Sequence, residues 1–440
     1  MTDAYPISPP RRLLLAVGGD HLGQWLPVCI ARALPSTECR FIGQLWSDGH
    51  FVRAAGLRYR SWPWSWSVPD VEVPSSIPNH TDFHIRNLSI SALPAPVRRA
   101  YGMLQTLAAQ EVDQFQPDAV ISLTAELALS HLLDGLARSR GIAAIGLQTT
   151  YLRQALLVHA DGARWWQVLR DAELSGPYVT ESVQMVMPKL KSQSAGHTPR
   201  RSWVWAARAE RLIRATLGVP SFDSVGDLLT TLTRPHTQRL GGFPDFKTPD
   251  IGEQPPSGLA LVALHRPVLQ VGEPDWTDLL RFALAVTPPD WALVVRPHPD
   301  EPERPLPDDL AQALFKRGAR VSRPRQGASL DRLLQTARLL ITLNSATGLQ
   351  ALLAGVPTVT LAPAFYARPG MAWAADFREP QSVQTLLARG DLPRPNVAAV
   401  QAFVRWIEAS RSASLPPISD EAVVANAVAE RICLLAGGSK

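Results

Sequence analysis

The stretch RLLITLNSATGLQALLAGVPTVTLA, residues 338–362, combines two strand patterns and one helix pattern in 25 residues. Its first six residues form an apolar run of strand length. TGLQALLAG then has the apolar spacing of a helix that ends near Gly355 and Pro357, and TVTLA resumes as a strand. Between the first strand and the helix stand Asn344, Ser345 and Thr347. The stretch therefore predicts an α/β layer with an unusually polar junction.

The same alternation extends along most of the chain. Strands are expected at 13–17, 39–46, 117–123, 142–148, 259–264, 291–297, 319–322, 338–343 and 358–362. Helices are expected from the loop 18–23 to about residue 34, and at 126–141, 276–286, 308–318, 329–337, 347–355 and 421–436. Residues 117–148 form a βαβ unit, for which a right-handed crossover is expected.

A linker divides this pattern. Residues 164–240 are Arg-rich and helical in pattern, whereas 239–258 are rich in Gly, Pro and Asp. We therefore predict a GT-B-like α/β fold with two Rossmann-type domains facing a central cleft. The first domain spans residues 1–245 and carries a helical insertion, the second spans residues 246–440, and the last helix packs back on the first half, with a ligand expected in the cleft between them.

Composition limits the classes of function. The chain has 440 residues, 46% of them apolar and 19% charged, and a net charge of +5. These values describe a globular protein whose mild positive field suits an anionic ligand, and we find no nucleic-acid-binding motif. Three cysteines without metal-type spacing indicate reduced thiols. Because neither a signal peptide nor a long apolar run is present, we expect a cytoplasmic protein whose membrane association, if any, is peripheral to the inner membrane's cytoplasmic face.

The polar junction suits an anion. Side chains of Asn344, Ser345 and Thr347, with Gly348 behind them, fall at a helix N-terminus, where free N–H groups and the helix dipole favour negative charge. The alternative is a plain N-cap, which needs only one of these side chains.

A second motif, RPHPDE, follows the expected strand 291–297. Pro297 and Pro299 hold His298 in an extended loop at the strand's carboxyl end, and Arg296 adds a guanidinium. The alternative is a solvated surface loop. Both loops leave the same expected sheet at the same end, which favours a shared phosphate site.

Three further residues are candidates for catalysis. His265 follows the strand 259–264, Asp20 lies in the Gly-rich loop after the first strand, and Glu126 lies where another strand meets a helix. A carboxylate at such a strand end can act as a general base. Glu126 could equally be a first-turn residue whose negative charge interacts favourably with the helix dipole, and His265 could be a loop residue without a role in the site. No metal-binding pattern is present, and the loop after the first strand lacks a full dinucleotide fingerprint, so we expect neither a metal nor a cofactor.

Over residues 259–371 the chain resembles the capsule polysaccharide biosynthesis family, the Kps-type proteins. The resemblance rests on LVVRPHPDEP and on ITLNSATGLQALLAGVPTVTLAPAFYARPGM. It implies a cytoplasmic GT-B transferase that moves Kdo from CMP-Kdo, the nucleotide-sugar donor, onto a saccharide or glycolipid acceptor in capsule or lipopolysaccharide biosynthesis. It also implies that residues 246–440 are the nucleotide-sugar-binding domain, in which His298, Pro299, Ser345 and Thr347 hold the CMP part of the donor, and that residues 1–245 are the acceptor-side domain.

The chain departs from the family at QTTYLR, residues 148–153. The family carries an acidic motif here, but Gln148, Thr149 and Thr150 supply no carboxylate. Either another carboxylate (Glu126, Asp20 or Asp161) replaces it, or the chemistry differs, or the protein binds without turnover. The chain is also similar to UDP-GlcNAc 2-epimerases, but those carry a Glu pair where this chain has Gln350 in LQAL.

Overall fold

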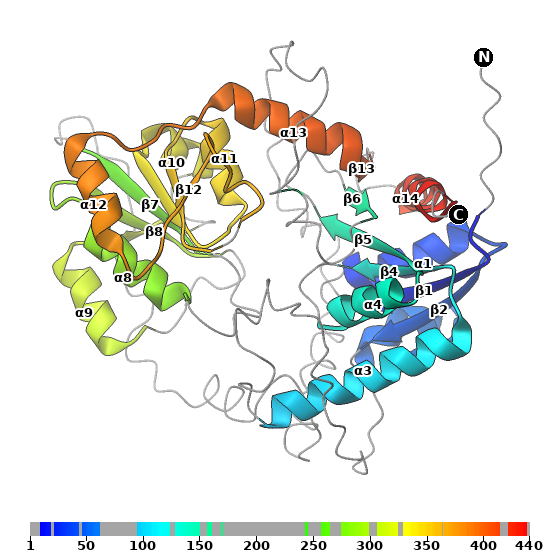
Figure 1. Cartoon of the computed structure of the whole chain (residues 1–440). Coiled ribbons are helices and arrows are strands. Elements are labelled where there is room, and N and C mark those ends of the chain that lie inside the picture. The colour runs from blue at the N-terminus through cyan, green and yellow to red at the C-terminus, as the bar shows by residue number, and fades with distance from the viewer. Residues whose placement is uncertain are drawn as a thin grey trace, which may run out of the picture.

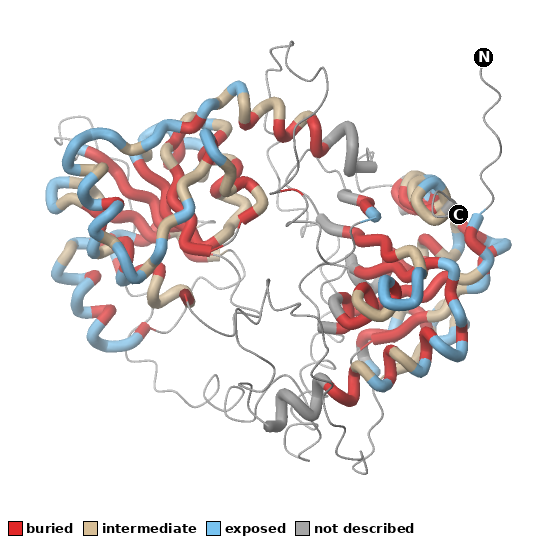
Figure 2. The backbone as a smooth tube through the Cα atoms, viewed as in Figure 1, coloured by how far each residue is buried: buried red, intermediate tan, exposed pale blue. Residues whose placement is uncertain are grey.

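The computed structural model describes two α/β units (Figure 1). The described residues are 9–18, 22–43, 46–61, 95–123, 128–149, 156–160, 169, 243–244, 257–264, 274–298, 306–323, 329–362, 364–413 and 421–437. Buried residues concentrate along the strands and on the helix faces turned toward them (Figure 2). Each unit therefore has its own layered core.

The first sheet has the order β13-β6-β5-β4-β1-β2-β3 within the described residues. Its parallel strands are β1 Arg12–Val17, β2 Glu38–Gly43, β3 Tyr59–Ser61, β4 Ala119–Leu123 and β5 Ala143–Thr149. The antiparallel strands β6 Leu156–His159 and β13 Ser412–Ala413 complete one edge. From the centre of the sheet, β1, β2 and β3 follow one another toward one edge, and β4, β5 and β6 follow one another toward the other edge. This is the Rossmann arrangement.

Alternate residues of β1 face two different helical layers. Leu13 and Leu15 pack with helices α1 Leu22–Ala33, α2 His50–Ala54 and α14 Glu421–Gly437. Leu14 packs with α3 Ala95–Phe115 and α4 Ala128–Ser139. Both faces are apolar because a parallel sheet is covered on both sides, and this explains the unbroken apolar run in the sequence.

The second sheet has the order β12-β11-β10-β7-β8-β9 within the described residues, and all its pairings are parallel. Its strands are β7 Leu259–Ala263, β8 Ala292–Arg296, β9 Arg320–Val321, β10 Leu339–Thr342, β11 Thr358–Thr360 and β12 Trp373–Ala374. Counted along the chain, this is the Rossmann order 3-2-1-4-5-6, which reverses between β7 and β10.

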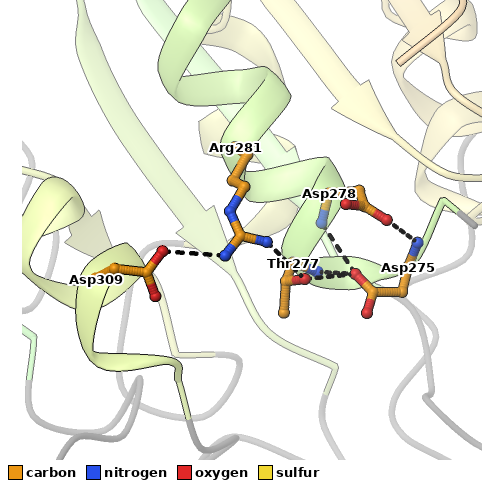
Figure 3. A network of polar contacts seen from close by, with 5 residues as sticks. All are labelled: Asp275, Thr277, Asp278, Arg281 and Asp309. Carbon is orange, nitrogen blue, oxygen red and sulfur yellow. Dashed lines mark hydrogen bonds and ion pairs between the residues drawn. The ribbon is translucent and has the colours of Figure 1, made fainter. Parts of the chain in front are cut away.

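Helices also cover both faces of the second sheet. One face packs with α8 Trp276–Val286, α9 Asp308–Lys316 and α12 Pro380–Arg389. The other face packs with α10 Leu330–Thr336 and α11 Thr347–Leu353. Asp275 caps α8 by accepting from the amides of Thr277 and Asp278, and Arg281 joins α8 to Asp309 of α9 (Figure 3).

One C-terminal helix contacts both units, and the next returns to the first. Helix α13, Val397–Arg411, contacts α11 of the second sheet and β6 and β13 of the first. Helix α14 packs on α1 and β5, and its Val428 and Ile432 lie in the core of the first sheet. The two Rossmann-type sheets and the returning C-terminal helix confirm the predicted fold class.

Most predicted elements are confirmed with small shifts in their ends. Additional elements are short strands (β3, β6, β12, β13), the 3-10 turn η1 Ser47–Gly49, and four helices (α2, α3, α12, α13). The Arg-rich segment and most of the predicted linker lie outside the described residues, so the boundary between 245 and 246 stays a prediction. Phe243 packs in the core of the second unit, and Val321 donates to the Pro244 carbonyl oxygen.

Candidate functional site

The polar junction lies where the strand order of the second sheet reverses. Strands β7 and β10 are adjacent and parallel, with Ala263 opposite Thr342. Loops that leave two such strands diverge to opposite sides of the sheet and open a crevice at the carboxyl edge. The residues 343–346, which connect β10 to α11, begin at this edge. Topology therefore places the junction at the position where open α/β sheets bind ligands.

Local hydrogen bonds shape the junction. The hydroxyl of Thr342 donates to the Ala263 carbonyl oxygen at 3.0 Å and accepts from the Ser345 amide at 3.2 Å. The Ser345 hydroxyl oxygen accepts from the Thr347 amide at 3.3 Å and lies 3.3 Å from the Thr347 hydroxyl oxygen. Asn344, Ser345 and Thr347 are half-buried. The two hydroxyls form one polar cluster that is accessible to solvent.

Gly348 and a residue further along the chain close the back of the junction. The Gly348 amide donates to the Ser345 carbonyl oxygen at 2.8 Å, and the Tyr366 hydroxyl donates to the same oxygen at 2.5 Å. A Cβ atom on Gly348 would lie 2.2 Å from that phenolic oxygen. Tyr366 was not among the predicted site residues, although it lies in AFYARPGM, part of the stretch on which the resemblance to the capsule family rests.

The RPHPDE loop leaves the same edge. Strand β8 pairs with β7 on the side opposite β10, and the Leu264 amide donates to the Arg296 carbonyl oxygen at 3.0 Å. Two strand spacings put the ends of β8 and β10 about 10 Å apart. His298, which is half-buried, follows two residues beyond β8. The prediction that both loops leave one sheet at the same end is confirmed, whereas Pro299 and His265 lie outside the described residues.

Arg296 is held against the sheet by its neighbours. Its guanidinium donates to the Ser322 hydroxyl at 3.3 Å. Burial lowers the pKa of Arg296 below its usual value, and the nearby Asp331 carboxylate opposes this shift. An arginine stays protonated in proteins, so this half-buried group places a fixed positive charge at the edge near His298.

The first sheet has a corresponding edge at β1 and β4. These strands are adjacent and parallel, and Gly18 directly after β1 has a φ of 145°, which a residue with a side chain rarely adopts. Asp20 and Glu126 follow these two strands but lie outside the described residues, so their roles stay predictions. Gln148 and Thr149 are the last residues of β5 and pair with β6. The position of the family's acidic motif thus also falls at a carboxyl strand end.

The second-sheet arrangement can hold an anion by hydrogen bonds from hydroxyls at the junction, with an arginine charge at the same edge. Such bonds to a charged group are worth about 1.5–3 kcal/mol each. In the described part of the chain, no group of three His, Cys, Asp or Glu residues is placed to hold a metal ion. No helix there has the length and apolar character needed to cross a membrane.

Comparison with known proteins gives one match to a family. Residues 266–390, less than a third of the chain, match the family described as capsule polysaccharide biosynthesis protein. The matched region contains RPHPDE and the polar junction. No curated protein matches the chain.

Several solved structures align along most of the chain. The glycotransferase of kitacinnamycin is 17% identical, with 91% of this chain and 95% of that chain covered and a TM-score of 0.33. The UDP-GlcNAc 2-epimerase from Neisseria meningitidis, bound to UDP-GlcNAc, is 10% identical over 90% and 99%, with a TM-score of 0.33. The spinosyn rhamnosyltransferase is 15% identical over 91% and 96%, with a TM-score of 0.33.

Proposed function

We propose that the chain is a glycosyltransferase of capsule or lipopolysaccharide biosynthesis, because residues 266–390 match the capsule polysaccharide biosynthesis family. The proposed donor is CMP-Kdo, and the proposed acceptor is a saccharide or glycolipid. The reaction needs neither a resident cofactor nor a metal in this proposal. The proposed location is the cytoplasm, with peripheral association with the inner membrane where the acceptor is a glycolipid.

One observation carries the proposal: the hydroxyl cluster stands at the reversal point of a Rossmann sheet, on the edge that also carries RPHPDE. The Ser345 and Thr347 hydroxyls, 3.3 Å apart, suit the oxygens of one phosphate group. His298 emerges at the same edge on the other side of β7. The donor nucleotide would therefore bind to the second unit, with its phosphate at the junction.

Transfer requires the bond between the anomeric carbon and the phosphate oxygen to break. CMP leaves with the bonding electron pair, an acceptor hydroxyl oxygen bonds to the anomeric carbon, and its proton passes to a base. The Ser345 and Thr347 hydroxyls and the positive charge of Arg296 would stabilise the negative charge that develops on the leaving phosphate. Glu126, Asp20 or His265 would accept the proton.

A binding protein without turnover is the second candidate. The absence of carboxylates at Gln148 and Thr149 favours it, since a retaining double displacement needs a carboxylate nucleophile. Gln350 of α11 lies in LQAL, where the epimerases carry a Glu pair, and this argues against an epimerase-like reaction on UDP-GlcNAc.

The test is release of CMP from CMP-Kdo, measured with and without a glycolipid acceptor. We expect acceptor-dependent release, and Glu126→Gln should lower the rate by about 100-fold or more if Glu126 is the base. Glu38→Gln is the matched control: Glu38 is the first residue of β2 and lies at the end away from the carboxyl strand ends, so the rate should be unchanged. If the wild-type protein binds CMP tightly but releases no CMP from CMP-Kdo, the result would support the binding role. Binding of UDP but not CMP would overturn the donor assignment.

A further inference from the structure

We propose that Tyr366 is a positioning residue of the donor site, which holds the polar junction in the conformation that binds phosphate. Tyr366 touches no substrate in this proposal, because its side chain is fully buried behind the junction. The inference rests on the proposed function for its meaning, but the structural effect can be measured without any ligand.

The hydroxyl of Tyr366 reaches the junction across 21 residues of sequence. It donates to the Ser345 carbonyl oxygen, which also accepts from the Gly348 amide. These two bonds fix the peptide plane that follows Ser345. The orientation of that plane helps to set the directions of the Ser345 hydroxyl and of the Thr347 amide. The Thr347 amide donates a hydrogen bond to the Ser345 hydroxyl oxygen. One buried phenol therefore controls the geometry of a polar cluster that faces solvent.

The fit between Gly348 and the Tyr366 ring is a second, independent sign of this role. A Cβ atom on Gly348 would lie 2.2 Å from the phenolic oxygen and 2.4 Å from Cζ, and no real Cβ approaches other atoms so closely. A buried tyrosine hydroxyl needs some partner in any protein. Here, however, the ring also occupies the space that any side chain at position 348 would require, so ring and junction are shaped to each other.

The ring itself is held in place by α13. Tyr366 packs in one cluster with Leu349 and Leu352 of α11 and with Val400 and Phe403 of α13. Phe365 meets the Tyr366 ring edge-on at 5.2 Å between centroids. Because close-packed side chains have little freedom to move, the hydroxyl is delivered to Ser345 at little further cost in entropy. A ring that only filled space would need no hydroxyl, so the hydrogen bond to Ser345 distinguishes the positioning role from space filling.

Tyr366→Phe is the direct test, because it removes the hydroxyl and keeps the packed ring. We expect hydrogen exchange of the Gly348 amide to accelerate roughly three- to tenfold, as loss of one net hydrogen bond predicts, while amides of β10 stay protected. CMP should bind more weakly by a similar factor, and the thermal unfolding midpoint should fall by no more than the few degrees that one lost hydrogen bond predicts. Tyr59→Phe, which removes the same atom in the first sheet, should change neither measurement at the junction.

Unchanged exchange and CMP affinity in Tyr366→Phe would overturn the proposal, as would a lowered unfolding midpoint with normal affinity, because that pattern is purely structural. If the wild-type protein binds neither CMP nor UDP, the proposed function fails, and the exchange experiment still decides whether Tyr366 fixes the junction.

Gly348→Ala supplies a second test through the ring contact. Alone, it should accelerate exchange at the junction and weaken CMP binding more than Tyr366→Phe does, because the new methyl group displaces the ring. In a Tyr366→Leu background, where the space is free, the same substitution should have a much smaller additional effect. Additive effects of the two substitutions would contradict the contact on which the positioning role depends.

Discussion

Two threonines on neighbouring strands allow a matched test of how the junction is built. Thr342 of β10 and Thr360 of β11 are register partners, and both are fully buried. The Thr342 hydroxyl donates to the Ala263 carbonyl oxygen and accepts from the Ser345 amide. Among the residues that the structure describes, the Thr360 hydroxyl has no hydrogen-bond partner. Replacement by valine keeps the shape at both positions and removes only the hydroxyl.

The two substitutions should have opposite consequences. Thr342→Val removes two hydrogen bonds, each worth about 1 kcal/mol net, so the free energy of unfolding should fall by about 2 kcal/mol. Thr360→Val removes a buried polar atom that gains nothing in the folded state, so stability should be unchanged or higher.

The assay is urea unfolding of both variants followed by circular dichroism. With a denaturant dependence of about 2 kcal/mol per molar urea, Thr342→Val should lower the midpoint by about 1 M. Thr360→Val should leave the midpoint in place or raise it. Equal losses in the two variants would refute the claim that Thr342 ties the junction to β7.

Two further predictions concern the rest of the fold. Asp275→Ala removes the cap of α8 and should lower the free energy of unfolding, measured with urea, by about 1 kcal/mol. Asp309→Ala breaks the exposed ion pair with Arg281 (Figure 3) and should leave the urea midpoint unchanged. A larger loss of stability in Asp309→Ala than in Asp275→Ala would contradict the capping assignment. Burial, and secondarily Glu38, raises the pKa of Cys39 to about 12, so its thiolate is scarce at pH 8. Alkylation of Cys39 by iodoacetamide should therefore be at least about tenfold slower in the native than in the urea-unfolded protein, as followed by peptide mass spectrometry. Equal rates would contradict the raised pKa of Cys39.

Local sequence signals account for much of the second unit. Helix α8 begins and ends where predicted, because Asp275 caps an amphipathic run of eleven residues. Strands β7, β8 and β10 are apolar runs of a length that only strands fit. The helix α3 also has an apolar stripe, with Leu104, Leu107 and Phe115 buried, so periodicity could have revealed it. The two-residue strands β12 and β13 carry too little pattern to be predicted and depend on tertiary pairing.

The site was predictable only in part, for the same reason. Asn344, Ser345 and Thr347 are marked by their own chemistry next to two apolar elements. Tyr366 is not, because its role follows from a hydrogen bond across 21 residues and from the empty position at Gly348. Contacts of this kind arise from topology and packing, which one sequence does not display.

The most direct test of the central claim is a calorimetric titration of CMP into the wild-type protein, His298→Ala and His50→Ala. His50 is an exposed histidine of α2 in the first unit and serves as the matched control. We predict that the wild-type protein and His50→Ala bind CMP equally, and that His298→Ala binds it at least about tenfold more weakly, as expected for loss of a hydrogen bond to a charged group. Normal CMP affinity in His298→Ala would contradict the placement of the nucleotide at the edge shared by RPHPDE and the polar junction.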